Sequence, residues 1–174
     1  MSAADLPVRR ALPTVALVGR PNVGKSTLFN RLVGGHNAIV EDEPGVTRDR
    51  RYGDSDWSGK AFRVVDTGGL DLAAARAESA TITRGIVDQA MRAVDEAALI
   101  VFVLDGQEGP TPGDRDAATV LRRTGKPVVW VANKIDGAHR EQLTNEVYTL
   151  GADNVIGISA QHGRNIGELL DAIL

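Results

Sequence analysis

One run of eight residues has the composition and spacing of a phosphate-binding loop. It reads Gly19-Arg20-Pro21-Asn22-Val23-Gly24-Lys25-Ser26 and matches the pattern GxxxxGK[ST]. Glycines allow the backbone to curl so that several N–H groups point at one anion, and a helix that begins directly after the run adds partial positive charge. In this pattern Lys25 is expected to reach the β- and γ-phosphates of a nucleotide, and the Ser26 hydroxyl to bind Mg²⁺. The run therefore predicts a site for a nucleoside polyphosphate.

A second motif, Asp66-Thr67-Gly68-Gly69, directly follows an apolar segment. A carboxylate at the C-terminal end of a strand, beside a phosphate-binding loop, can hold Mg²⁺ through water. Gly69 has no side chain to shield its backbone N–H, which can therefore reach a γ-phosphate. Taken alone, the motif is typical of an ordinary Asp-Gly turn. Together with the phosphate-binding loop it favours a site for Mg²⁺ and the γ-phosphate.

The third motif, Asn133-Lys134-Ile135-Asp136, suits the recognition of guanine. Guanine presents its N1–H and N2 amino group on one edge, and a single carboxylate, Asp136, can accept from both. Adenine lacks this donor pair, so it would leave the carboxylate unpaired at a cost of about 1–3 kcal/mol or more. Asn133 is expected to brace neighbouring loops, and the stem of Lys134 to lie over the base. A fourth motif, Ile158-Ser159-Ala160, offers the backbone N–H of Ala160 as a candidate donor to guanine O6.

These motifs follow short apolar segments that have the length of strands buried on both faces. The five segments are Thr14–Val18, Ala61–Val65, Ala98–Leu104, Val128–Ala132 and Asn154–Ile158. A sixth segment, Arg50–Trp57, is more polar and is predicted to be an edge strand. The short connection Ser58-Gly59-Lys60 joins it to the next segment, which predicts an antiparallel hairpin.

Helical patterns alternate with the predicted strands. They cover Ser26–Val33, Ala80–Val94, Gly113–Arg123, His139–Leu150 and a C-terminal segment in which Ile166, Leu169, Leu170, Ile173 and Leu174 share one face. Thr111-Pro112 and Asp114 are start signals for the third of these helices, and Gly125 is its stop signal. Alternating strands and helices predict a doubly wound α/β domain whose ligands bind at the carboxyl ends of the strands.

The four motifs together resemble the G domain of the P-loop GTPases over nearly the whole chain from Thr14 onward. The run from Gly19 to Asn30 is similar to the Era-like bacterial GTPases. Pro44–Arg50 and Asp66–Gly69 most resemble the first G domain of the Der (EngA) family of ribosome-assembly GTPases. The resemblance implies a mostly parallel six-stranded sheet with one antiparallel edge strand and helices on both faces. It also implies a G domain over 14–174, as a fragment of a longer protein with a second G domain and a KH-like domain. Residues 1–13 have no apolar core of the signal-peptide type and are predicted to be a flexible leader.

The resemblance further implies a role for each matching residue. Thr47 corresponds to the switch I threonine, which binds Mg²⁺ and the γ-phosphate in the GTP state, with an ordinary loop threonine as the alternative. Asn22 matches an asparagine that helps to bind K⁺ in these families, with a simple cap of the loop as the alternative. The implied catalytic set is Lys25, Asn22, Thr47 and Gly69, and the implied Mg²⁺ set is Ser26, Thr47 and Asp66. The implied nucleotide-binding set is Gly19, Arg20, Pro21, Asn22, Val23, Gly24, Lys25, Ser26, Thr27, Asp66, Gly69, Asn133, Lys134, Asp136, Ser159 and Ala160.

The function that follows is Mg²⁺-dependent hydrolysis of GTP to GDP, activated by K⁺ and used as a switch in assembly of the large ribosomal subunit. Leu70 motivates an alternative, because many signalling GTPases carry at this position a glutamine that orients the attacking water, and a leucine side chain cannot. In that alternative the domain is a nucleotide-binding regulatory module with little hydrolysis of its own. An ATP-using protein is disfavoured by the motif that ends in Asp136.

Composition excludes several other classes of function. The chain has 174 residues, a net charge of -3 and no cysteine, so disulfides, thiolate metal sites and cysteine nucleophiles are excluded. The longest apolar run, Ala97–Leu104, is too short to span a bilayer, and we expect a cytoplasmic protein. The basic clusters are short and mixed with acids, which favours a solvated surface over a nucleic-acid patch. The three histidines share no metal-ligand spacing.

Overall fold

A six-stranded sheet forms the centre of the protein. The computed structural model describes residues 12–34, 51–67, 91–136 and 146–174. The strand order is β2-β3-β1-β4-β5-β6, and all neighbours pair in parallel except β2, which runs antiparallel to β3 at the edge. The strands are β1 (Thr14–Val18), β2 (Arg51–Trp57), β3 (Lys60–Asp66), β4 (Leu99–Asp105), β5 (Val128–Asn133) and β6 (Val155–Gly157). The predicted sheet, with its single antiparallel edge strand, is confirmed.

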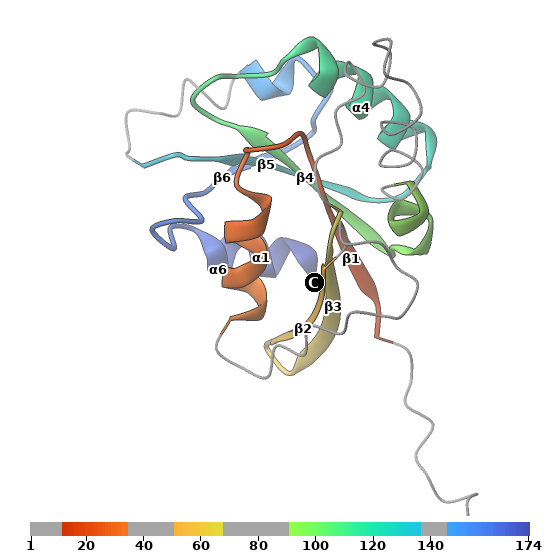
Figure 1. Ribbon diagram of the computed structural model, residues 1–174, viewed down its shortest axis with the longest axis vertical. Coiled ribbons are helices and arrows are strands. Elements are labelled where there is room, and N and C mark those ends of the chain that lie inside the picture. Colours follow the sequence, from red (N-terminus) through yellow and green to blue (C-terminus); the bar gives the residue numbers. More distant parts are fainter. Residues whose placement is uncertain (1–11, 35–50, 68–90, 137–145) are drawn as a thin grey trace, which may run out of the picture.

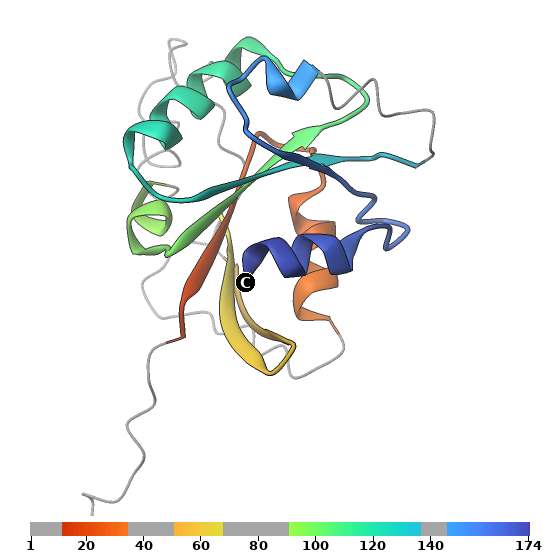
Figure 2. The same ribbon diagram turned by 180° about the vertical axis from the view of Figure 1, so that it is seen from behind.

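Helices cover both faces of the sheet, as predicted. On one face lie α1 (Lys25–Val33) and α6 (Ile166–Ile173), and on the other lies α4 (Pro112–Arg123), as the two opposite views show (Figures 1 and 2). Side chains along β4 alternate between the two cores. Ile100, Phe102 and Leu104 face the core under α4, whereas Val101 and Val103 face the core under α1 and α6. Burial of both faces explains why the strands have nearly continuous apolar sequences.

Local sequence signals account for the boundaries of two elements. The Thr111 hydroxyl accepts from the Asp114 N–H, and the Asp114 carboxylate accepts from the Thr111 N–H, which together form a capping box at the start of α4. The β2–β3 hairpin turns at Ser58 and Gly59, both with positive φ, which matches the twist of paired strands. These start and turn signals were predicted from the sequence.

Some predicted boundaries were wrong by one residue. β4 begins at Leu99, one residue after the predicted start, and β6 is shorter than predicted at both ends. The second and fourth predicted helices are described only over residues 91–96 and 146–148, which are helical. Thr47, Gly69 and Leu70 lie outside the described residues, as does most of the predicted leader. Among the described residues, no helix has both the length and the apolar character needed to cross a membrane.

Candidate nucleotide-binding site

The carboxyl ends of the parallel strands bring the predicted motifs to one rim of the sheet. Gly19 follows β1, Asp66 is the last residue of β3, and Asn133 is the last residue of β5. Ser159 lies two residues beyond β6 and is buried. Because parallel strands end on the same side of a sheet, residues that are more than a hundred positions apart in sequence share one site.

The phosphate-binding loop has a backbone that a chain of ordinary residues would not adopt. Gly24, the N-cap of α1, has φ of 98°. A Cβ atom at this position would also collide with the side-chain amide of Asn133. Glycine is therefore required for both the turn and the close approach of the two motifs. The first turn of α1 itself carries no acidic residue, so no carboxylate of the helix opposes the partial positive charge of its N-terminus.

Lys25 is a buried cation at the start of α1. Its side chain is 6% exposed, and its Nζ donates to the backbone carbonyl of Arg20 at 2.9 Å. Burial lowers the pKa of Lys25 from 10.5 to about 8, although the nearby Asp66 carboxylate opposes this shift. A buried ammonium that donates to a neutral carbonyl is suited to receive an anion, because phosphate oxygens would stabilise the charge that burial disfavours.

This pKa predicts how the affinity for GDP depends on pH. Phosphate oxygens favour the charged amine, so the pKa of Lys25 is higher with nucleotide bound than without it. Above pH 8 binding then requires proton uptake, and the affinity falls as pH rises, by up to about tenfold per pH unit. Titration calorimetry between pH 7 and 9 measures this slope. Lys25→Arg is the control, because its guanidinium stays charged over this range. Equal slopes for both proteins would contradict the assignment.

Ser26 and Asp66 supply the oxygen ligands that Mg²⁺ prefers. The Ser26 hydroxyl donates to Asp66 Oδ2 at 3.3 Å, and the Asp66 residue is 4% exposed. Both are hard donors, and Mg²⁺ in proteins is commonly bound by one or two such groups together with water and substrate phosphates. No group of three or more His, Asp or Glu side chains gathers within the described residues. The donor set therefore fits Mg²⁺ that is completed by a nucleotide.

Asn133 joins three loops of the rim. Its Nδ2 donates to the backbone carbonyl of Val23 at 2.9 Å, and its Oδ1 accepts from the N–H of Ala160 at 3.0 Å. The bracing role predicted for Asn133 thus has a geometric basis. The Ala160 N–H, which sequence reasoning offered to guanine O6, is already engaged, so a purine oxygen would share this donor with Asn133. Asp136 is exposed, and its Oδ1 lies 4.0 Å from Nε2 of His162.

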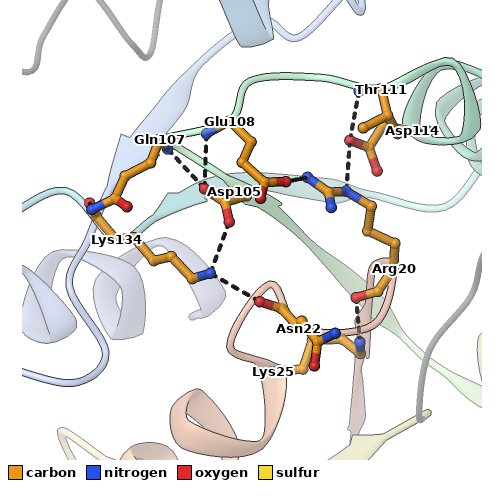
Figure 3. A network of polar contacts seen from close by, with 9 residues as sticks. All are labelled: Arg20, Asn22, Lys25, Asp105, Gln107, Glu108, Thr111, Asp114 and Lys134. Atoms are coloured by element: carbon orange, nitrogen blue, oxygen red, sulfur yellow. Dashed lines mark hydrogen bonds and ion pairs between the residues drawn. The ribbon is translucent and has the colours of Figure 1, made fainter.

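A polar network ties the phosphate-binding loop to the ends of β4 and β5 (Figure 3). Lys134 Nζ donates to the Asn22 carbonyl at 3.0 Å and to Asp105 Oδ2 at 2.8 Å. Asp105 Oδ1 accepts from the N–H groups of Gln107 and Glu108. Burial alone raises the pKa of Asp105, but the hydrogen bonds from Lys134 and the two backbone groups outweigh it and hold the pKa below its usual value. Sequence reasoning missed Asp105, although its position at a strand end was a signal.

The Arg20 side chain points away from the phosphate loop (Figure 3). Its Nη2 donates to Glu108 at 2.9 Å, and its Nε lies 3.4 Å from Asp114, whose side chain is 2% exposed. Arg20 is one of the residues expected to bind nucleotide, and its backbone lies in the loop. Its guanidinium instead connects the loop to the start of α4.

Two pockets on the rim adjoin each other. One pocket, of about 360 Å³, is lined by Asp66 at the end of β3 and by residues of the phosphate loop, among them Pro21, Asn22, Lys25 and Ser26. The other, of about 210 Å³, is lined by residues of the two base motifs together with Gln107 and Gln161, which sequence reasoning missed. Gly24 and Thr27 line both pockets. A single elongated ligand with an anionic end and a planar polar end can therefore occupy both.

Comparisons with known proteins agree with this geometry. The model of the 50S ribosome-binding GTPase family matches residues 14–134. GTPase Der of Desulfitobacterium hafniense (strain Y51) is 53% identical over 162 residues, which cover 93% of this chain and 36% of that protein. GTPase Der of Natranaerobius thermophilus is 53% identical over 161 residues, 92% of this chain and 35% of that protein. The chain thus spans just over a third of the length of these curated relatives.

Two solved structures are also similar to this chain in fold and sequence. An Aquifex aeolicus Era variant bound to GDP·AlF4⁻ superposes with a TM-score of 0.77 at 32% identity, covering 94% of this chain and 56% of that chain. The G domain of T. maritima FeoB superposes with a TM-score of 0.71 at 26% identity, covering 92% of this chain and 96% of that chain. The resemblance to Der and Era that the motifs indicate is confirmed, and the chain belongs to the family of 50S ribosome-binding GTPases.

Proposed function

We propose that this domain binds GTP and GDP together with Mg²⁺, hydrolyses GTP to GDP, and changes its switch segments with the state of the nucleotide. The observation that carries the proposal is the junction of the two pockets at Gly24 and Thr27. One pocket holds the buried cation of Lys25, and the other is lined by the carboxylate of Asp136. A guanine nucleotide carries the complementary groups in the same order, an anionic chain and an edge with two N–H donors.

The base end is proposed to select guanine through Asp136. Its carboxylate accepts from N1–H and the N2 amino group, and the stem of Lys134 covers the base. Asn133 holds the loops around this carboxylate, through its bonds to Val23 and Ala160. Ser159 and the Ala160 N–H complete the base pocket. The support is that Asn133 and Ser159 are both buried and hydrogen-bonded, which holds these two residues in place.

The phosphate end is proposed to hold the anionic chain with the remaining residues of the predicted set. The backbone from Gly19 to Thr27 surrounds the phosphates, and Lys25 donates to the β- and γ-phosphates. Ser26 and, through water, Asp66 hold Mg²⁺, with Thr47 as a further ligand in the GTP state. Bound Mg²⁺ neutralises charge that develops on the phosphates during hydrolysis. Gly69 donates its N–H to the γ-phosphate.

Hydrolysis is proposed to depend on K⁺ bound near Asn22. The support is that Asn22 lines the phosphate pocket and that its backbone, at φ of 68°, is fixed by the bond from Lys134. A fixed cation beside the phosphates stabilises developing negative charge. The K⁺ ion would compensate for the absence of a water-orienting glutamine at the position of Leu70. The alternative, a nucleotide-binding module with little hydrolysis of its own, rests on the same Leu70.

The wider role is proposed from the family. The matched family model is that of 50S ribosome-binding GTPases, and curated relatives are named GTPase Der. We therefore place this domain in a cytoplasmic protein that acts in assembly of the large ribosomal subunit.

The test is phosphate release from GTP by the domain in KCl and in NaCl at equal ionic strength. We expect K⁺ to raise the rate by about tenfold or more. Asn22→Ala should lose this preference while keeping its affinity for GDP within about threefold, because the loop backbone binds the phosphates. Equal rates in both salts would contradict the role of K⁺. No release in either salt, from a domain that binds GTP, would favour the alternative of a binding module.

A further inference from the structure

Arg31 connects the helix that starts at the phosphate loop to the loop that borders the base pocket. It lies in the last turn of α1. Its Nε donates to the carbonyl of Ala160 at 2.7 Å, and its Nη2 donates to the carbonyl of Gln161 at 2.6 Å. One guanidinium thus binds two successive backbone carbonyls that lie about 130 residues further along the sequence. The fixed fork of donors makes this possible, and a lysine ammonium has no equivalent geometry.

The loop that Arg31 holds is built around the guanidinium. Ser159 and Arg164 pair in a short antiparallel bridge, which closes the turn between them. Gly163 has φ of 71°, and a Cβ there would come within 3.3 Å of Arg31 Nη1. The turn therefore packs closely against the Arg31 guanidinium. Because Gly163 has no side chain, the guanidinium has space beside the turn.

Ala160 is held from both sides. Its N–H donates to Asn133 Oδ1, and its carbonyl accepts from Arg31. The first contact positions it against the base motif and the second against α1. Helix α1 starts at Lys25, beside the phosphate loop, and carries Arg31 in its last turn. This one helix of nine residues therefore connects the phosphate loop to the Ala160 peptide, which is proposed to face the base.

We propose that Arg31 is a positioning residue for guanine recognition, which sets the distance between the base-binding loop 159–161 and the phosphate loop without touching the nucleotide. This inference rests on the proposed binding of guanine nucleotides. Loss of the fork would release the loop from α1, so the contact with the O6 side of the base would weaken. Asp136 lies on a different loop and would keep its two contacts.

The experiment compares GDP with 6-thio-GDP, which keeps the N1–H and N2 amino group but carries a larger, weaker acceptor at position 6. Affinities are measured by titration calorimetry with Mg²⁺ for the wild type, Arg31→Met and Arg31→Lys. Arg123→Met is the matched control, because Arg123 is an exposed arginine in the last turn of α4. Thermal unfolding is recorded for each protein.

We expect Arg31→Met to lower the affinity for GDP about tenfold and the affinity for 6-thio-GDP less than about twofold. The preference for GDP over 6-thio-GDP would then be largely lost. Arg31→Lys should fall between the wild type and the methionine variant for GDP, and Arg123→Met should match the wild type. If Arg31→Met does not fold, the lysine variant carries the test, with a smaller loss of affinity for GDP that again exceeds its loss for 6-thio-GDP. Equal losses for both nucleotides, or none, in a protein whose wild type binds GDP would overturn the inference. A wild type that does not bind GDP would refute the proposed function itself.

Discussion

Lys25→Met is expected to abolish tight binding of GDP with Mg²⁺ while making the nucleotide-free domain more stable. The substitution removes the buried ammonium that faces the phosphate pocket, and charge-assisted hydrogen bonds to phosphate are among the strongest in proteins. We expect the affinity to fall on the order of a hundredfold to a thousandfold. The stability rises because burial lowers the pKa of Lys25 to about 8, so the folded protein disfavours a charge that the unfolded chain keeps without cost.

The size and sign of the stability effect follow from the same pKa. A decrease from 10.5 to about 8 corresponds to roughly 3 kcal/mol against the charged form. Between pH 8 and 10.5 the unfolded chain binds more protons at Lys25 than the folded chain, so this group makes the wild type more stable as pH rises. The advantage of Lys25→Met is therefore largest at pH 7 and shrinks toward pH 10.

Calorimetric titration with GDP and urea unfolding at pH 7 and pH 10 measure both parts of this prediction. Lys60→Met is the control, because Lys60 is an exposed lysine in the hairpin of β2 and β3. Unchanged GDP affinity would show that Lys25 does not face the phosphates. A nucleotide-free variant that is less stable than the wild type at pH 7 would contradict the cost assigned to the buried charge.

Asp136→Asn is expected to change the preferred base from guanine to xanthine. Xanthine keeps the N1–H but has a carbonyl oxygen in place of the N2 amino group. An asparagine amide accepts from the first and donates to the second, whereas the wild-type carboxylate meets the xanthine oxygen with repulsion. The ratio of affinities for GDP and xanthosine diphosphate should therefore change by about a thousandfold or more.

Competition between the two diphosphates measures this ratio directly. Asp136 is exposed, so the variant is expected to fold. Asp153→Asn, at an exposed aspartate near the start of β6, is the matched control and should keep the wild-type ratio. If the GDP affinity of Asp136→Asn equals that of the wild type, the base pocket has been assigned to the wrong residues.

Most of the architecture could be predicted because local patterns agree with it. The apolar run Thr14–Val18 is β1 without change, and the signals around Thr111 mark the start of α4. Three of the errors, at the C-terminal ends of β3, β4 and β5, share a cause. Apolar runs stop before the last residue of a strand, whereas the ladder continues to Asp66, Asp105 and Asn133. Pattern reasoning therefore ends these three strands one residue early, at the rim where the polar residues of the candidate site lie.

The contacts that fix the site could not be read from local patterns. Arg20 meets Asp114 across 94 residues, and Arg31 meets Ala160 across 129. No periodicity or motif relates residues at such distances. Arg20 was predicted as a nucleotide-binding residue of the phosphate loop and Arg31 only as part of a helix. Asp105 lay one residue beyond the predicted strand Ala98–Leu104 and was given no role, although its carboxylate accepts from Lys134 beside the phosphate loop. Such partners emerge only when the sheet order is known.

The central claim is that the two adjoining pockets together accept a guanine nucleotide with Mg²⁺. Parallel titrations of GDP and ADP, each with Mg²⁺, into the folded domain test it most directly. The geometry predicts that GDP binds one-to-one and releases measurable heat, whereas ADP, which lacks the donor pair for Asp136, shows no saturable signal. Equal binding of the two nucleotides, or no binding of GDP, would contradict the account.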